Sequence, residues 1–214
     1  MPNRFPSLRL VRHNLLEHKL SLMRDKNCPP TEFSALMKDI GVILACELSR
    51  DLPLAETAIE TPVAPMRARF LSGKAPVIVA VLRAGLGLAD GLYSMLPMAS
   101  RGHIGLYRDH VTLQPVEYLR RLPEPESRLF IIADPMVATG NSACHAVDVL
   151  IRHGVSPADI IFVAVVVAPE GMARFARDHP DIPVYTAALD THLNEHAYIV
   201  PGLGDAGDRT FGTL

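Results

Sequence analysis

The sequence has no tryptophan and only three cysteines among its 214 residues. Cys28, Cys46 and Cys144 are odd in number and widely spaced, so they indicate neither a disulfide framework nor a cysteine-type zinc site. The longest uninterrupted apolar run, Ile160–Ala168, is far too short to span a membrane. The first ten residues show no apolar core of the signal-peptide kind. We therefore expect a cytoplasmic protein with reduced thiols and no membrane contact.

Neither positive nor negative charge is in large excess. The net charge is −2, and no run of lysine or arginine supplies a basic face. Binding to nucleic acid or to an anionic membrane surface is therefore not expected. Nearly half of the residues are apolar and about a fifth are charged, which is typical of a globular protein rather than a disordered one. The length predicts a single domain, 1–214, with a substantial core.

The apolar segments predict the fold class. Three runs, 77–82, 129–133 and 160–167, are apolar throughout, as strands buried on both faces are, and 184–188 is a further clear strand. They alternate with amphipathic helical patterns, which predicts an α/β fold with a mostly parallel sheet flanked by helices. Ligands of such sheets bind beyond the carboxyl ends of the strands, where Arg83, Arg108 and Asp134 fall. The remaining expected elements are helices at 18–26, 31–44 (N-capped by Thr31), a helical stretch after Gly91 to about 95, and helices at 143–151 and 170–179. Strands are expected at 55–62 and 104–107, a polar and turn-prone connection at 108–125, and irregular chain from 192 onward.

The most informative stretch is 129–149, in which a buried strand ends at Asp134 and Pro135. Four small or polar residues, 139–142, then precede a helical pattern. Backbone N–H groups at such a helix start form a cradle for a phosphate, here with a carboxylate beside it. A Walker loop is excluded because no lysine lies between Asp134 and Ser142. On spacing alone, an ordinary strand–turn–helix joint remains an alternative.

Two other motifs offer rival interpretations. Gly85, Gly87 and Gly91 approach the dinucleotide fingerprint G-x-G-x-x-G, with Asp109 roughly 20 residues on as a ribose-binding acid. The third glycine is one place late, and the leading arginine suits a bare diphosphate better. The segment 192–196, H-L-N-E-H, matches the H-x-x-E-H pattern of zinc peptidases. Its neighbours leave no room for the helix that such a zinc site needs.

A glycine-rich loop, 202–208, carries Asp205 and Asp208 near the end of the sequence. Three glycines in such a short loop allow the backbone to approach a ligand closely. The preceding apolar residues, 199–201, anchor the loop to the body of the protein. We therefore favour a binding loop over a solvated turn with two exposed acids.

Several blocks together resemble the uracil phosphoribosyltransferase family. The segment 134–142, D-P-M-V-A-T-G-N-S, is similar to the family's signature for phosphoribosyl diphosphate (PRPP). Blocks 18–24, 83–87 and 193–209 agree with the same family, and 105–115 resembles its mobile loop. Two residues depart from the pattern, because Asn141 and Ala197 stand where the family usually has glycine. Since asparagine tolerates left-handed backbone angles, we expect the cradle to survive with altered phosphate contacts.

The resemblance implies a type I phosphoribosyltransferase fold, Rossmann-like, with a mobile loop at 109–121 over the site and a C-terminal base-binding hood. It implies transfer of ribose 5-phosphate from PRPP to N1 of uracil, which gives UMP and diphosphate. The implied catalytic residues are Asp134, Arg108 and Asp205. The residues implied for PRPP are Arg83, Arg108, Asp134, Pro135, Met136, Val137, Ala138, Thr139, Gly140, Asn141, Ser142 and Asp205, and those implied for uracil are Ile199, Gly204, Asp205 and Ala206.

The resemblance also implies cofactors and partners. Mg²⁺ would arrive bound to PRPP, and the chain would have no metal site of its own. A homodimer or homotetramer is expected, with GTP as an effector to be tested. A non-enzymatic regulator of pyrimidine genes on the same fold is a further alternative; it would bind RNA, which the lack of a basic face disfavours.

Overall fold

The computed structural model describes residues 5–108 and 115–213. Its centre is an eight-stranded sheet that is parallel except where β6 runs antiparallel to β5. This arrangement confirms the expected α/β fold with a mostly parallel sheet. The strand order is β1 (Leu8–Leu10), β10 (Val184–Leu189), β9 (Ile160–Val167), β7 (Phe130–Ala133), β4 (Val77–Leu82), β5 (Ser100–Arg108) and β6 (Pro115–Arg121), with the short β8 (Met136–Val137) also paired to β9.

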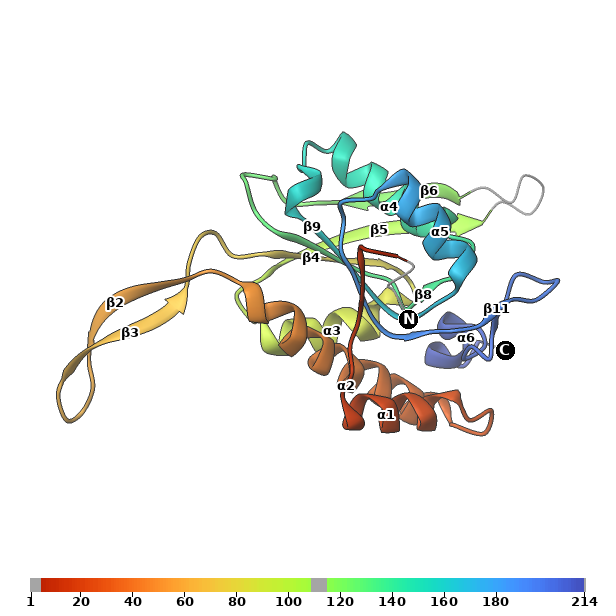
Figure 1. Cartoon of the computed structure of the whole chain (residues 1–214), viewed down its shortest axis with the longest axis horizontal. Helices are drawn as coiled ribbons and strands as arrows, with labels where there is room; N and C mark the ends of the chain where they lie inside the picture. Colours follow the sequence, from red (N-terminus) through yellow and green to blue (C-terminus); the bar gives the residue numbers. More distant parts are fainter. Residues whose placement is uncertain (1–4, 109–114, 214) are drawn as a thin grey trace.

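Helices cover both faces of the sheet (Figure 1). One face packs against α1 (Asn14–Arg24), α2 (Pro30–Leu48) and α3 (Gly85–Met95), and the other against α4 (Asn141–Arg152) and α5 (Pro169–Asp178). Short 3₁₀ turns lie at Ser49–Asp51 and Pro157–Asp159. No helix in the described ranges is both long and apolar enough to cross a bilayer.

The alternation of side chains along β4 shows why its sequence is apolar throughout. Ile78 and Ala80 belong to the core beneath α1–α3, whereas Val77 and Val79 belong to the core beneath α4 and α5. All four side chains are fully or almost fully buried. Because both faces of the strand are covered, neither face has a polar position. The strand therefore brings its carboxyl end, and Arg83 after it, to the edge of a rigid core.

Several expected boundaries were wrong in part. The helix expected at 18–26 begins earlier, at Asn14, and α2 begins at Pro30, with Pro29 rather than Thr31 at the N-cap position. The strand expected at 104–107 begins at Ser100. The polar connection expected at 108–125 contains β6, which pairs antiparallel to β5. Residues 109–114, the rest of the expected mobile loop, lie outside the described residues.

A hairpin of β2 (Leu54–Glu60) and β3 (Pro65–Leu71) extends away from the body of the molecule (Figure 1). Only β2 was expected from the sequence. Residues that pair across the two strands share a face of the hairpin. The pairs show that the two faces differ in polarity, so the hairpin is amphipathic. One face carries Glu56 paired with Arg69. The opposite face carries the pairs Ala55–Phe70, Thr57–Ala68 and Ile59–Met66.

The C-terminal region forms a hood at the opposite end of the molecule from the hairpin (Figure 1). Its regular parts are the small antiparallel pair β11 (His192–Leu193) and β12 (Ile199–Val200), followed by α6 (Ala206–Phe211). The irregular chain expected from residue 192 is therefore built from short elements. These elements place the glycine-rich loop near the carboxyl end of β7.

Candidate active site

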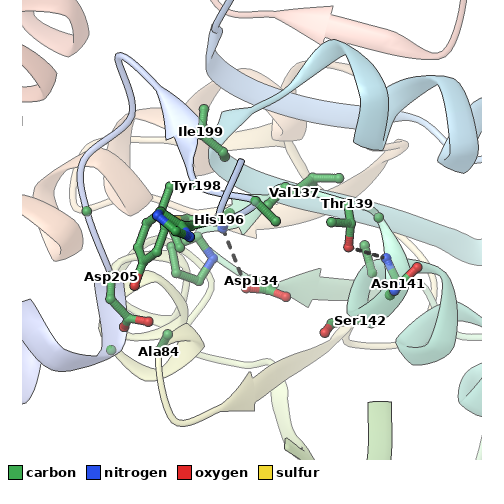
Figure 2. A pocket seen from close by; sticks show the side chains of 18 residues that line it. Ala84, Asp134, Val137, Thr139, Asn141, Ser142, His196, Tyr198, Ile199 and Asp205 are labelled. Atoms are coloured by element: carbon green, nitrogen blue, oxygen red, sulfur yellow. Dashed lines mark hydrogen bonds between the residues drawn. The ribbon is translucent and has the colours of Figure 1, made fainter. Parts of the chain in front are cut away.

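A cavity of about 480 Å³ lies between the carboxyl edge of the sheet and the hood. Residues 134–143 line one side, and residues 196–199 with Gly204, Asp205 and Gly207 line the other. Figure 2 shows Asp134 between these two groups, with Thr139, Asn141 and Ser142 on one side of it and Tyr198 and Asp205 on the other. The structure thus brings together two segments that are separated by about fifty positions in the sequence.

Asp134 is the buried acid of this cavity, and it directly follows β7. Its backbone N–H donates to the Val163 carbonyl of the neighbouring strand β9 at 3.1 Å, which fixes the turn at the strand end. The residue is only 9% exposed, and its carboxyl group accepts one long bond, 3.5 Å, from the Met136 N–H. Burial raises the pKa of Asp134 to about 7, and the Met136 N–H opposes this only weakly. Hydroxyl donors from a ligand would stabilise the ionised form.

The phosphate cradle is the turn 138–142 at the start of α4. Gly140 is the N-cap residue, with φ of 81°, and a Cβ there would lie 2.9 Å from the Gly171 carbonyl oxygen of α5. A glycine is therefore required both by backbone angle and by close approach. The N-cap has no side chain to bond the N–H groups of the first turn, and of these the Asn141 N–H makes a long bond, 3.5 Å, to Thr139 Oγ1. The structure therefore has the strand, turn and helix start expected from the sequence, and the binding of a phosphate there stays a prediction.

Asn141 does not occupy the left-handed conformation that we considered for it. It is the first residue of α4, in helical conformation, and Gly140 before it takes the positive φ. The Asn141 side-chain oxygen accepts a hydrogen bond from Nη1 of Arg174 on α5. Arg174 Nε in turn lies 3.5 Å from the Asp178 carboxylate. The side chain of Asn141 thus ties the cradle to α5.

Ala197, the other departure from the family pattern, does occupy a strained position. Its φ is 61°, in the left-handed region, where a Cβ costs about 1–2 kcal/mol. It closes a tight turn, in which its N–H donates to the Asn194 carbonyl at 2.9 Å. The Asn194 side chain accepts from the N–H groups of His196 and Tyr198 at 3.0 and 2.9 Å. These bonds hold the alanine in a conformation that glycine would adopt without strain.

In the glycine-rich loop, Ile199, Gly204 and Asp205 line the cavity. Ala206 is buried and begins α6. One carboxylate oxygen of Asp205 accepts from the Asp208 N–H at 3.0 Å, so Asp205 is the N-cap of α6 as well as a cavity residue. The loop therefore forms part of the cavity wall, in which Gly204 and Asp205 are exposed.

The chain matches the family model for uracil phosphoribosyltransferase over residues 10–213. The chain belongs to this family. The uracil phosphoribosyltransferase of Rhodospirillum centenum is 57% identical over 209 residues, which are 98% of this chain and 97% of the relative. That of Burkholderia multivorans is 54% identical over 213 residues, with coverage of 99% and 97%. The solved structure of the AQ2163 protein from Aquifex aeolicus superposes with a TM-score of 0.90 at 31% identity, and covers 95% of this chain and 97% of its own.

Within this family member, the segment that resembles the PRPP signature, 134–142, lines the cavity along its whole length. The two arginines expected at the diphosphate are placed differently. Arg83 is exposed and its guanidinium lies over the Phe211 ring, 5.2 Å from the centroid, rather than lining the cavity. The backbone of Arg108 ends β5, and its side chain is outside what the structure describes.

Six residues that line the cavity were not among the site residues expected from the sequence: Ala84, Ala143, His196, Ala197, Tyr198 and Gly207. His196 and Tyr198 lie side by side on the hood side of the cavity (Figure 2). The signal that could have found them is their position in the block 193–209, which resembles the family along its whole length. His196 was considered only as part of the H-x-x-E-H motif. That segment forms β11 and a turn, not the helix that a zinc peptidase requires.

The glycines of the near-fingerprint have a packing explanation. A Cβ at Gly85 would lie 2.2 Å from the Ala133 carbonyl oxygen, and one at Gly91 would lie 2.2 Å from the Lys38 carbonyl oxygen. These glycines let α3 approach β7 and α2 closely. The structure therefore accounts for both glycines without a dinucleotide.

Asp134 yields a prediction about stability. A carboxyl group whose folded pKa is raised stabilises the fold fully below its unfolded pKa of about 4. That contribution declines as the pH rises and is lost once the pH passes the folded value of about 7. Asp134→Asn removes the buried charge, so between pH 4 and pH 8 the free energy of unfolding of the ligand-free variant should gain on the order of 4 kcal/mol relative to wild type.

Thermal and urea unfolding of the ligand-free proteins between pH 4 and 9 measures this difference. The gap between Asp134→Asn and wild type should widen up to about pH 7 and then level off. The exposed Asp181 provides the control, because Asp181→Asn should show no such pH-dependent gap. A gap for Asp134→Asn that stays constant over the whole range would contradict the raised pKa.

Proposed function

We propose that this chain transfers ribose 5-phosphate from PRPP to N1 of uracil. The bond between C1 of the ribose and the diphosphate breaks, the N1–C1 bond forms, N1 loses its proton, and the products are UMP and diphosphate. One observation carries the proposal: a single cavity joins a phosphate cradle, a buried carboxyl group and a glycine-rich loop of the C-terminal hood. Membership of the uracil phosphoribosyltransferase family supports the same reaction.

In this proposal the cradle holds the 5-phosphate of PRPP. The backbone N–H groups of 138–142 and the hydroxyls of Thr139 and Ser142 are the donors. Asp134 accepts hydrogen bonds from the ribose hydroxyls, which favour its ionised form. Pro135, Met136 and Val137 complete the wall between the acid and the cradle, where they line the cavity.

Arg83 and Arg108 are proposed to neutralise the diphosphate, because each follows or ends a strand at the carboxyl edge of the sheet. Arg83 would have to leave Phe211 to do so. Mg²⁺ is treated as part of the substrate, Mg–PRPP, in which it screens the diphosphate charge. Asp134 and Asp205 are the cavity carboxylates that it could meet, and the described residues hold no group of three potential protein ligands.

Uracil is proposed to lie against Ile199 and the segment 204–206, read largely by main-chain groups. Gly204 has φ of 75° and no Cβ, so its backbone is open to a planar base. Asp205 lies where it can also touch PRPP or its metal. Tyr198 and His196 add aromatic surface on the same wall.

The chemistry of this reaction suits the arrangement. Loss of diphosphate builds positive charge at C1 and negative charge on the leaving group. The protein therefore acts mainly by orienting the two substrates and by stabilising charge, with no nucleophile of its own. The carboxylates of Asp134 and Asp205 favour positive charge at the ribose, while Arg83 and Arg108 favour negative charge on the diphosphate.

We also propose that the protein is a homo-oligomer held together by the hairpin. The apolar face of the hairpin, defined by Ala55, Ile59, Met66, Ala68 and Phe70, is largely exposed in the single chain, with Met66 and Phe70 each 49% exposed. A two-stranded hairpin alone is marginally stable in water. A second copy of the chain supplies an apolar surface of matching kind, and burial on both copies would stabilise the hairpin.

The remaining proposals concern the setting of the enzyme. The whole chain, 1–214, is taken as one phosphoribosyltransferase domain. A cytoplasmic location fits a substrate as highly charged as PRPP, which does not cross membranes unaided. GTP is proposed as an effector. Measuring diphosphate release from PRPP and uracil with and without GTP tests this proposal. Replacing uracil with other nucleobases in the same assay tests the choice of base.

Asp134→Ala should lower turnover with uracil and PRPP by at least about 100-fold, because it removes the acceptor for the ribose hydroxyls. UMP formation measures the loss, and circular dichroism checks that the fold is retained. Asp181→Ala, at an exposed position, is the matched control and should keep wild-type turnover. Near-normal UMP formation by Asp134→Ala would show that this carboxyl group has no part in the reaction.

Phe70→Glu should dissociate the oligomer, because it places a charge in the apolar face of the hairpin. Light scattering coupled to gel filtration should give the mass of a single chain for this variant and a multiple of it for wild type. Ala58→Glu puts the same charge on the opposite face of the same hairpin and should leave the mass unchanged. Equal masses for wild type and Phe70→Glu would rule out the hairpin as the interface.

A further inference from the structure

A buried ion pair lies behind the hood, outside the residues that line the cavity. Asp190 directly follows β10, and its side chain is 5% exposed. Arg24, in the last turn of α1, binds it with both arms of the guanidinium: Nη2 lies 2.6 Å from Oδ1 and Nη1 lies 2.9 Å from Oδ2. The two residues are 166 positions apart in the sequence. The pair therefore joins the first helix to the end of the sheet next to the hood.

The same pair holds both backbone polar groups of Gly202. The Gly202 N–H donates to Asp190 Oδ2 at 3.0 Å, and the Gly202 carbonyl accepts from Arg24 Nη1 at 2.5 Å. Gly202 is buried, has φ of 62°, and packs so closely that a Cβ would lie 2.1 Å from the Ile199 carbonyl oxygen. It lies between Ile199 and Gly204, two residues that line the cavity.

A second arginine strengthens this connection from the other side. Arg209 of α6 donates through Nη1 to the carbonyls of Met23 and Leu203, each at 2.8 Å. Its Nη2 donates to the Asp25 carbonyl at 2.5 Å, and its guanidinium lies 4.5 Å from the centroid of the Phe33 ring. The end of α1 is thus bound to the hood at Gly202 and at Leu203.

We propose that Arg24 and Asp190 are positioning residues that set the geometry of the uracil loop, 199–206. The inference rests on the proposed function, since it concerns the half of the cavity assigned to the base. Apart from Asp205, which is shared, the PRPP half is built from other elements, β7, β8 and the start of α4. The pair should therefore act on the use of uracil far more than on the binding of PRPP.

The contacts that Arg24 makes with Asp190 and Gly202 require an arginine rather than a lysine at this position. One planar guanidinium meets both carboxylate oxygens and a carbonyl, whereas an ammonium group is a point donor that cannot match this fork. Arg24→Lys therefore keeps the charge and most of the packing but loses the alignment of Gly202. Misplacement of a bound substrate by about 1 Å can cost 100-fold in rate, so a large kinetic effect is expected from a small shift of the loop.

Steady-state kinetics with each substrate varied in turn tests the proposal. In Arg24→Lys, the KM for uracil should rise about tenfold or more, and the KM for PRPP should stay within about twofold of wild type. Asp190→Asn, which keeps the shape of the side chain, should shift the KM for uracil in the same direction. Equal increases in both KM values, or no increase in either, would overturn the proposal.

Lys19 provides the matched control on the same helix. Its Nζ lies 2.6 Å from the Asp39 carboxylate of α2, in an ion pair that does not involve the hood. Lys19→Met should leave both KM values unchanged even if it lowers the melting temperature. A rise in the KM for uracil in Lys19→Met equal to that in Arg24→Lys would attribute the effect to general weakening of α1 and overturn the assignment.

Amide hydrogen exchange provides a readout that does not depend on the identity of the substrate. Exchange at residues 202–205 should be faster in Arg24→Lys than in wild type, and should be unchanged in Lys19→Met. Unchanged exchange in Arg24→Lys would refute the positioning role. Failure of wild type to form UMP would instead refute the proposed function, and the exchange comparison would still decide whether the pair orders the loop.

Discussion

The parallel register of the central strands is the constraint on which the site depends. β4, β7 and β9 run in the same direction side by side, so their carboxyl ends meet at one edge of the sheet. Asp134 follows the middle strand of these three, and its backbone is bonded to β9. The apolar side chains on both faces hold the strands rigidly. A small error in strand register would move the acid away from the cradle.

That constraint also explains the unusual state of Asp134. The strand end places the carboxyl group where little water reaches it, and burial raises its pKa to about 7. An ionised carboxyl group that has only one weak donor within the protein lowers the stability of the free protein at neutral pH. A local loss of stability of this kind is common at binding sites, because their groups are arranged to interact with a ligand rather than with one another. In this account, the ribose hydroxyls complete the environment that the protein leaves incomplete.

The sequence predicted the features that depend on local pattern. The strands 77–82 and 160–167 and the turn at 139–142 that leads into α4 were predicted because apolar runs and small residues report directly on burial and on turns. It did not predict β6 or β3, which are largely exposed strands without a continuous apolar run, so their pairing is decided by their neighbours. It also could not show that Arg83 lies over Phe211, because that contact joins residues far apart in the chain.

We infer that below pH 7 Asp134 is largely protonated in the free protein and that it becomes ionised when PRPP binds. Isothermal titration of Mg–PRPP in buffers of different ionisation enthalpy measures the protons released on binding. Near pH 6.5, wild type should release about three-quarters of a proton more than Asp134→Asn, and the difference should vanish above about pH 8. Equal proton release by the two proteins at pH 6.5 would contradict the account.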